Sequence, residues 1–245
     1  MNMEQIRESS WQGCRRLDFA VENRESILVI PQTAAQGKPW AWRAEFFGSF
    51  DSVDRYLLKQ GYHLAYHRVS NRYGDDQSIR WMKQFHDGLT EAFGLSQKAA
   101  IFGFSRGGLY SINYAVKHPE DVGLLYLDAP VVDLFSWPAG LGKGEGDPPC
   151  WQQCKEIFGV EGDRPSFSEN PIDRIPQLAK NGIPLVLCAG DSDTAVPYEE
   201  NGLFLEQEYG SRRDFLLFLK HGCGHHPHSM ENPRGIAEFI LSNMG

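Results

Sequence analysis

The stretch 99–119, AAIFGFSRGGLYSINYAVKHP, constrains the possible folds of this chain more than any other segment. It joins an uninterrupted apolar run, typical of a strand buried on both faces, to a helix-like run that ends at a proline. A strand that passes directly into a helix needs a sharp turn, where glycines allow the two elements to approach closely. We therefore expect Gly103 and Gly107 to flank the turn and Ser105 to occupy its apex.

Other apolar runs along the chain have strand character, and most are separated by segments with helical spacing. This alternation predicts a mostly parallel sheet covered by helices on both faces. The first two runs are separated only by ENRE, which predicts an antiparallel hairpin at one edge. The expected strands are 16–21, 26–30, 63–69, 99–104, 122–127, 184–189 and 213–219, and the expected helices are 42–60, 79–93, 107–118, 151–158 and 232–244.

The segment 131–177 interrupts this rhythm. It is rich in glycine and proline, and only 151–158 within it has helical character. A long insertion with little regular structure is commonly a lid or a binding loop. Since the chain shows no internal repeat and no linker, we expect one α/β domain over 1–245 that carries this lid-like insertion.

Charge and composition exclude several classes of partner. The formal net charge of -8 leaves no broad basic surface, so we expect neither nucleic acid nor a membrane as a partner. The first twenty residues are too charged for a signal peptide, and the five cysteines are an odd number spread along the chain. These features predict a cytoplasmic protein with reduced thiols, and they do not determine its oligomeric state.

Ser105 has the surroundings of a nucleophile. The helix that begins just after it would direct amide N–H groups and a positive dipole end toward a developing oxyanion. A serine hydroxyl also needs a histidine base that is oriented by a carboxylate. Candidate acids follow two later strands, as Asp128 in LLYLDAP and as Asp191 and Asp193 in PLVLCAGDSDTAVP. Because carboxyl ends of parallel strands share one edge of a sheet, these side chains are expected near Ser105.

Candidate bases follow the last expected strand. The segment FLLFLKHGCGHHPH contains four histidines in eight residues: His221, His225, His226 and His228. Such a group could also bind a metal ion. However, these histidines lie on a loop of glycine and proline with no nearby carboxylate at ligand spacing. We therefore expect one catalytic base among solvated or supporting histidines, with no metal and no cofactor.

Three motifs in this order resemble the α/β-hydrolase superfamily, from about Arg15 to the C-terminus. They are Gly-Phe-Ser-Arg-Gly-Gly at 103–108, Gly-Asp-Ser-Asp-Thr-Ala-Val-Pro at 190–197 and Gly-Cys-Gly-His-His at 222–226. In family members the Gly-x-x-Asp-x-x-Val-Pro stretch carries the triad acid at its aspartate, which falls on Asp193. The base is the first histidine of Gly-x-Gly-His, here His225. The resemblance thus implies an α/β-hydrolase fold and a triad of Ser105, His225 and Asp193.

The second half of the oxyanion hole departs from the family pattern. Many members have a His-Gly pair after an early strand, whereas ILVIPQTAAQGKPWAWR at 27–43 has none. We expect one donor to be the amide of Arg106, which follows the nucleophile. The other is expected within 32–42, at Trp40.

These features predict a serine hydrolase that cleaves a carboxylic ester through an acyl-enzyme. The insertion lacks the long apolar helices of a lipid-binding cap, which favours a small-molecule ester with a small acyl or carbohydrate-linked group. A prolyl-peptidase-like amide hydrolase would share the same triad. A catalytically silent relative that only binds a ligand is an alternative of a different class.

Overall fold

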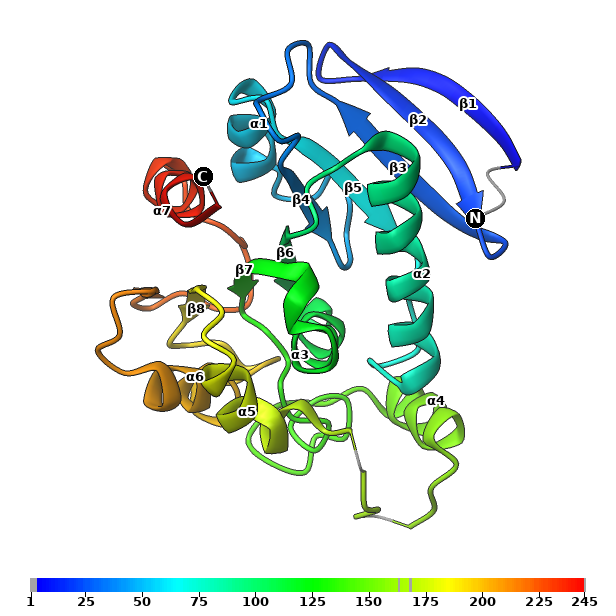
Figure 1. The fold of residues 1–245 in the computed structure, drawn as a ribbon. Helices are drawn as coiled ribbons and strands as arrows, with labels where there is room; N and C mark the ends of the chain where they lie inside the picture. Colours follow the sequence, from blue (N-terminus) through cyan, green and yellow to red (C-terminus); the bar gives the residue numbers. More distant parts are fainter. Residues whose placement is uncertain (1–3, 163, 168, 245) are drawn as a thin grey trace.

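The computed structural model of this chain describes residues 4–162, 164–167 and 169–244 (Figure 1). Its strands are β1 Glu4–Trp11, β2 Cys14–Val21, β3 Arg24–Ile30, β4 Trp40–Arg43, β5 His63–His67, β6 Ala99–Phe104, β7 Val122–Asp128, β8 Leu185–Gly190 and β9 Phe215–Lys220. They form one sheet in the order β1-β2-β3-β5-β4-β6-β7-β8-β9. The pairs from β1 to β5 are antiparallel, and all pairs from β5 to β9 are parallel. The prediction of a mostly parallel sheet is therefore confirmed.

Helices cover both faces of this sheet (Figure 1). They are α1 Ser52–Lys59, α2 Asp76–Phe93, α3 Gly107–Lys117, α4 Pro148–Phe158, α5 Ile175–Lys180, α6 Gly202–Tyr209 and α7 Arg234–Met244. Buried residues of α2, α3, α5 and α6 belong to one apolar cluster, whereas those of α1 and α7 belong to another. Three short 3₁₀ helices are η1 Pro119–Asp121, η2 Pro171–Arg174 and η3 Tyr198–Glu200.

The central strand β6 shows why its sequence is apolar throughout. Ile101 points into the cluster under α2 and α3, and its neighbours Ala100 and Phe102 point into the cluster under α1 and α7. Successive side chains of a strand face opposite sides of the sheet, so a strand covered on both sides needs no polar positions. Every residue of β6 is buried.

The expectation of one helix over 42–60 is wrong for its first half. Trp42 belongs to β4, which pairs with β5 and β6. After β4, the chain turns through Phe46, Gly48 and Phe50, whose φ angles are 55°, 83° and 48°. A right-handed helix cannot include residues in this left-handed region, so α1 begins only at Ser52.

The predicted hairpin forms, but it is not the edge of the sheet. β2 and β3 pair antiparallel around Glu22 and Asn23, whose positive φ angles are typical of a two-residue hairpin turn. β1 then pairs outside β2. We did not predict β1 because its residues 6–10 are all exposed, so its sequence lacks the alternation of a half-buried strand.

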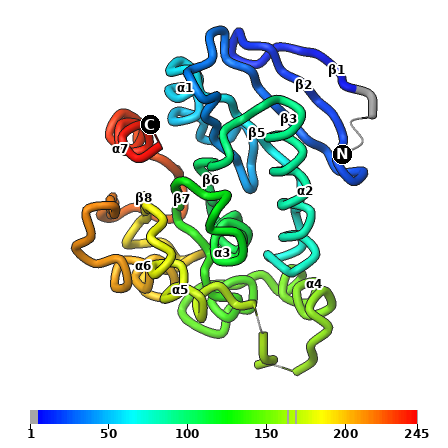
Figure 2. The backbone as a smooth tube through the Cα atoms, viewed as in Figure 1, coloured from blue at the N-terminus to red at the C-terminus, as the bar shows by residue number. Residues whose placement is uncertain are grey.

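The insertion 131–177 lies at the end of the molecule opposite β1 and β2 (Figure 2). Its expected helix is present as α4, which begins three residues earlier than predicted, after Asp147 accepts a hydrogen bond from the amide of Cys150. The insertion packs into a small apolar cluster, in which its residues Leu134, Cys154 and Phe167 are buried together with Leu109 of α3 and Val196. It is therefore a packed layer rather than an open loop.

Within the described ranges, none of the helices combines the length and the apolar character needed to cross a bilayer. All five cysteines lie in these ranges, and all are free.

A buried ion pair joins the end of β4 to α1. Arg43 and Asp54 have side chains that are 1% and 2% exposed. The guanidinium donates from Nε to Asp54 Oδ1 at 2.8 Å and from Nη2 to Oδ2 at 2.5 Å. Nη2 also donates to the carbonyl of Phe50. The pair therefore holds the turn that follows β4.

We expect Arg43→Met to lower the free energy of unfolding by about 3–5 kcal/mol, because it leaves the carboxylate of Asp54 buried without its partner. The double variant Arg43→Met/Asp54→Leu should recover most of this loss, since it removes both charges. Urea unfolding followed by circular dichroism measures both variants. A double variant no more stable than the single one would contradict the ion pair as the cause.

Candidate active site

Ser105 lies at the apex of the turn between β6 and α3, as the sequence predicted. Its φ angle of 49° is in the left-handed region, which costs a residue with a side chain about 1–2 kcal/mol. The main chain around β7 holds this conformation. The amide of Ser105 donates to the carbonyl of Asp128 at 3.0 Å, and the carbonyl of Ser105 accepts from the amide of Val131 at 2.9 Å. The hydroxyl is thereby presented at the carboxyl edge of the sheet.

The glycines of the turn differ in what they contribute. A Cβ at Gly103 would lie 2.5 Å from Ser111 Oγ and 2.8 Å from Leu127 Cδ2, so the contact of β6 with α3 requires glycine there. A side chain at Gly108 would be equally crowded, because its Cβ would lie 2.7 Å from both Pro130 Cβ and Val131 O.

At Gly107 the nearest atom would be Glu45 Cβ at 3.5 Å, which is an ordinary contact. The expectation that Gly107 is needed for close packing is therefore wrong. Its main chain forms the first residue of α3 without crowding from its neighbours.

The structure brings Ser105, His225 and Asp193 together. His225 Nε2 lies 3.0 Å from Ser105 Oγ, and His225 Nδ1 lies 2.7 Å from Asp193 Oδ2. Because an ionised carboxylate only accepts hydrogen bonds, Nδ1 carries the proton and Nε2 is free to accept one. The histidine side chain is 15% exposed and the aspartate side chain only 1%.

Asp193 is oriented by its own loop. Its second oxygen, Oδ1, accepts hydrogen bonds from the amides of Ala195 and Val196, both at 2.9 Å. These bonds fix the carboxylate just beyond β8 and leave Oδ2 to face the imidazole. A buried carboxylate with hydrogen bonds to both of its oxygens is a well-defined orienting group.

The two rival aspartates contact other histidines. Asp191 accepts from His221 Nδ1 at 2.8 Å and from the amide of Gly222 at 2.7 Å, and these bonds, with that to His221 first, lower the pKa of Asp191. Asp128 is fully buried and pairs with His228 Nδ1 at 2.9 Å. Neither carboxylate contacts His225 or Ser105 among the hydrogen bonds of the described residues.

Of the two residues predicted to form the oxyanion hole, Arg106 lies next to Ser105 and Trp40 does not. Arg106 follows Ser105 directly and precedes α3, as expected. The structure does not bring Trp40 to this site. Trp40 begins β4, so it lies at the amino end of the parallel strands, opposite the edge that carries Ser105. Its indole is buried, stacks on Trp42 and donates from Nε1 to the carbonyl of Ser96.

The main chain that does reach Ser105 from this side comes after β4. The Ala44 amide is already bonded to the carbonyl of Phe102. The Glu45 amide lies 3.8 Å from the position of a Cβ on Gly107, beside the start of α3. Phe46 lines the same cavity as Ser105. The turn after β4 was not expected, because the predicted helix 42–60 begins at Trp42 and covers it.

An apolar cavity of about 290 Å³ adjoins Ser105. Phe50 stacks on His226 with ring centroids 5.6 Å apart, and Phe104 lies against His228 at 5.5 Å. Burial, and then the neighbouring His228 and His225, lower the pKa of His226. The residues that line the cavity are Phe46, Ser49, Phe50, Phe104, Ser105, His225, His226 and His228.

A polar group that the sequence did not indicate borders Ser105 on the other side. Arg106 lies with Nε 3.5 Å from Glu45 Oε1, and its Nη1 donates to Asn71 Oδ1 at 3.1 Å. Ser70 donates to the other oxygen of Glu45 at 2.9 Å. Burial raises the pKa of Glu45 despite these partners. No local motif links Asn71, Ser70 and Glu45, so only the fold reveals the group.

Solved structures with the same architecture define the class of protein. The S-formylglutathione hydrolase from Agrobacterium tumefaciens is 13% identical over 100% of both chains, with a TM-score of 0.61. The Pyrococcus furiosus esterase Pf2001 is 16% identical over 98% of this chain and 93% of its own, with a TM-score of 0.64. Est1E from Butyrivibrio proteoclasticus is 14% identical over 97% and 98%, with a TM-score of 0.65. The fold is therefore that of the α/β-hydrolases.

The sequence itself places the chain more closely. The family model "Putative esterase" matches residues 58–239, which is well over half of the chain. The chain belongs to this esterase family, and it is a carboxylic ester hydrolase of the α/β-hydrolase superfamily. No curated protein matches the sequence.

The unequal contacts of the two motif glycines give a direct test. We expect Gly103→Ala to lower the free energy of unfolding by about 1–3 kcal/mol, because the added Cβ overlaps atoms of α3 and β7. Gly107→Ala, the matched control, should change it by less than about 0.5 kcal/mol. Equal effects in thermal unfolding would show that close packing of β6 on α3 does not explain the motif.

Proposed function

We propose that Ser105, His225 and Asp193 form the catalytic triad of this ester hydrolase. The observation that carries the proposal is the unbroken chain of hydrogen bonds from Asp193 Oδ2 through the imidazole to Ser105 Oγ. Nucleophile, base and orienting acid each need the next within hydrogen-bonding distance, and here all three are. The esterase family to which the chain belongs supports this assignment.

The geometry supports a two-step reaction. Ser105 Oγ attacks the carbonyl carbon of the ester while its proton passes to His225 Nε2, and the imidazolium is stabilised by Asp193. The same proton then goes to the leaving alcohol, which departs and leaves an acyl-enzyme. Water attacks the acyl-enzyme with His225 again as the base, releasing the carboxylic acid and restoring Ser105.

The oxyanion of each tetrahedral intermediate needs two amide donors. We assign one to Arg106, whose amide opens α3 directly after the nucleophile. The second we assign to the turn after β4, at Glu45 or Phe46, in place of Trp40. The position of the Glu45 amide, 3.8 Å from a Cβ on Gly107, supports this choice.

The cavity beside Ser105 supports a small acyl or aryl ester as the substrate. Its volume of about 290 Å³ is at the lower end for small-molecule sites, and aromatic rings form most of its wall. This lining is less suited to a carbohydrate, which needs several polar partners. We propose that 1–245 works as one domain, with the insertion 131–177 bordering the active-site edge.

Two of the candidate acids, Asp193 and Asp191, can be separated by equivalent substitutions. We expect Asp193→Asn to lower kcat by about 10³–10⁴-fold, because the amide no longer holds Nδ1 protonated and Nε2 free. Asp191→Asn, the matched control two residues away, should leave kcat close to that of the unmodified enzyme, since the carboxylate of Asp191 is bonded to Ser192, His221 and Gly222 and not to His225. Steady-state hydrolysis of p-nitrophenyl acetate measures both. A larger loss of kcat in Asp191→Asn than in Asp193→Asn would show that Asp191, and not Asp193, is the acid of the triad.

The size of the cavity predicts selectivity for the acyl group. We expect kcat/KM for p-nitrophenyl esters to be highest for acetyl to butyryl or benzoyl groups. It should fall by at least about tenfold for dodecanoyl, which the cavity cannot hold. The p-nitroanilides of the same acids serve as amide controls and should react far more slowly. A preference for long chains or for anilides would exclude a small-acyl esterase.

A further inference from the structure

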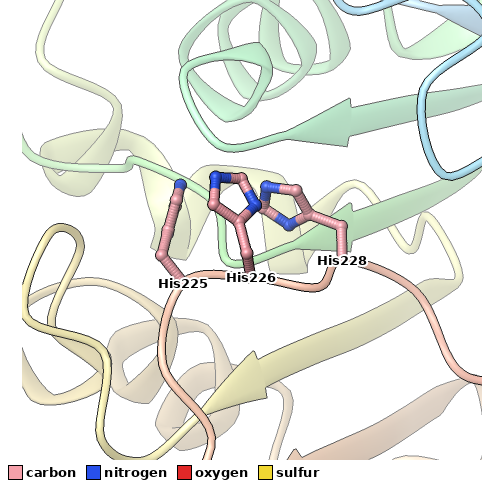
Figure 3. Close-up of side chains that lie close together, drawn as sticks. All are labelled: His225, His226 and His228. Carbon is pink, nitrogen blue, oxygen red and sulfur yellow. The ribbon is translucent and has the colours of Figure 1, made fainter.

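Three histidines crowd together at the catalytic edge (Figure 3). His225, His226 and His228 come from the loop between β9 and α7, and each pair of rings has centroids 4.9 Å apart. The rings are strongly inclined to one another, with interplanar angles of 67°, 80° and 88°. One nitrogen from each lies within 4.8 Å of those of the other two. This is an arrangement around a common centre rather than a stack.

The spacing fits three imidazoles around one metal ion. Zn²⁺ binds imidazole nitrogen at about 2.0–2.1 Å, and the ring centre lies about 1.1 Å further out, so tetrahedral angles place ring centroids about 5 Å apart. The observed separations have this value. Small side-chain rotations would therefore complete the coordination.

Two carboxylates already orient the rings as ligands. Asp193 accepts from Nδ1 of His225, and Asp128 accepts from Nδ1 of His228. Histidines that bind metals usually donate their other ring nitrogen to such a carboxylate, which fixes the tautomer and aims the remaining lone pair at the ion. The sequence shows no carboxylate at ligand spacing on this loop. The supporting role of Asp193 and Asp128 is visible only in the fold, because both come from other parts of the chain.

His226 supplies the third ligand and the route of access. Its residue is exposed, whereas His228 is buried. In the part of the chain that the structure describes, no hydrogen bond engages the imidazole of His226. Its ring is held instead by stacking on Phe50. An ion from solvent can therefore reach the centre past His226.

The other histidine clusters do not share these features. Around His86, the carboxylates of Asp87 and Asp121 are already paired with the ammonium of Lys83 at 2.5 and 3.2 Å. That internal cation occupies the place of a metal ion. The loop cluster contains three nitrogen donors. Its nearest ammonium, Lys220 Nζ, donates to the carbonyls of Pro227 and Ser229 and lies 4.0 Å from Asp128 Oδ1, so it contacts the supporting carboxylate rather than the ring nitrogens.

We propose that His225, His226 and His228 form a binding site for Zn²⁺ or a similar imidazole-seeking divalent ion, and that the bound ion inhibits the esterase. The ion would take the lone pair of His225 Nε2, the atom that now faces Ser105 Oγ at 3.0 Å. The serine then loses its proton acceptor. The inhibitory effect rests on the proposed triad, whereas binding of the ion does not.

Binding is tested apart from activity on the variant Ser105→Ala, which keeps all three histidines. Titration with CoCl₂ should give the intense visible absorption of four-coordinate Co²⁺, saturating at one ion per chain. Adding His226→Asn should weaken binding by at least about tenfold, because one of three protein ligands is lost. Adding His221→Asn, an exposed histidine on the same loop that pairs with Asp191, should not. No absorption, or equal loss with both substitutions, would overturn the site.

Inhibition is tested on the enzyme with Ser105 intact, with each variant compared with its own rate in EDTA. ZnCl₂ should inhibit the unmodified enzyme and His221→Asn alike, and EDTA should restore the rate. His226→Asn should need at least about tenfold more Zn²⁺. Inhibition that is the same in His226→Asn, or absent although Co²⁺ binds, would refute the inhibitory role. Hydrolysis that persists in Ser105→Ala would instead refute the proposed triad, and the Co²⁺ titration would still report on the metal site.

Discussion

The close approach of β6 to α3 determines where the hydroxyl of Ser105 lies in this protein. The strand can pass into the helix only because Gly103 presents no side chain to Ser111 and Leu127. Ser105 has a left-handed backbone conformation at this turn, and main-chain hydrogen bonds to Asp128 and Val131 stabilise it. The hydroxyl is thus fixed by backbone packing rather than by its own contacts, which leaves Oγ available to a base and a substrate.

A second close approach brings Asp193 and His225 to that hydroxyl. At the end of β8, a Cβ on Gly190 would lie 2.6 Å from the carbonyl oxygen of Gly224, so the loop after β9 can cross there only over a glycine. The amide of Ser192 then donates to the carbonyl of Cys223 at 3.0 Å, which ties the two loops together. Asp193 lies on the loop after β8 and His225 lies on the loop after β9. This crossing of the two loops therefore sets the 2.7 Å contact between Asp193 and His225. The same loop positions His226 and His228 against the cavity.

The sequence revealed features that depend on local pattern, and it missed those that depend on distant pairing. The strand-turn-helix around Ser105 and the motifs at Asp193 and His225 each lie within a few residues, so the side chains that meet could be named in advance. β4 could not be recognised, since its four residues are all buried and its pattern continued into an apparent helix. That error misplaced the second oxyanion donor at Trp40. The pairing of Asp128 with His228 spans 100 residues, and no local signal shows it.

If the proposed triad is correct, Ser105 becomes covalently acylated during turnover. The most direct measurement mixes the enzyme rapidly with p-nitrophenyl acetate, quenches it in acid within milliseconds and locates any added acetyl group by peptide mass spectrometry. The account predicts a burst of about one p-nitrophenol per active chain. It also predicts one acetyl group on the peptide that contains Ser105 and none in Ser105→Ala. Rapid steady hydrolysis with no burst, or acetyl on another side chain, would contradict it.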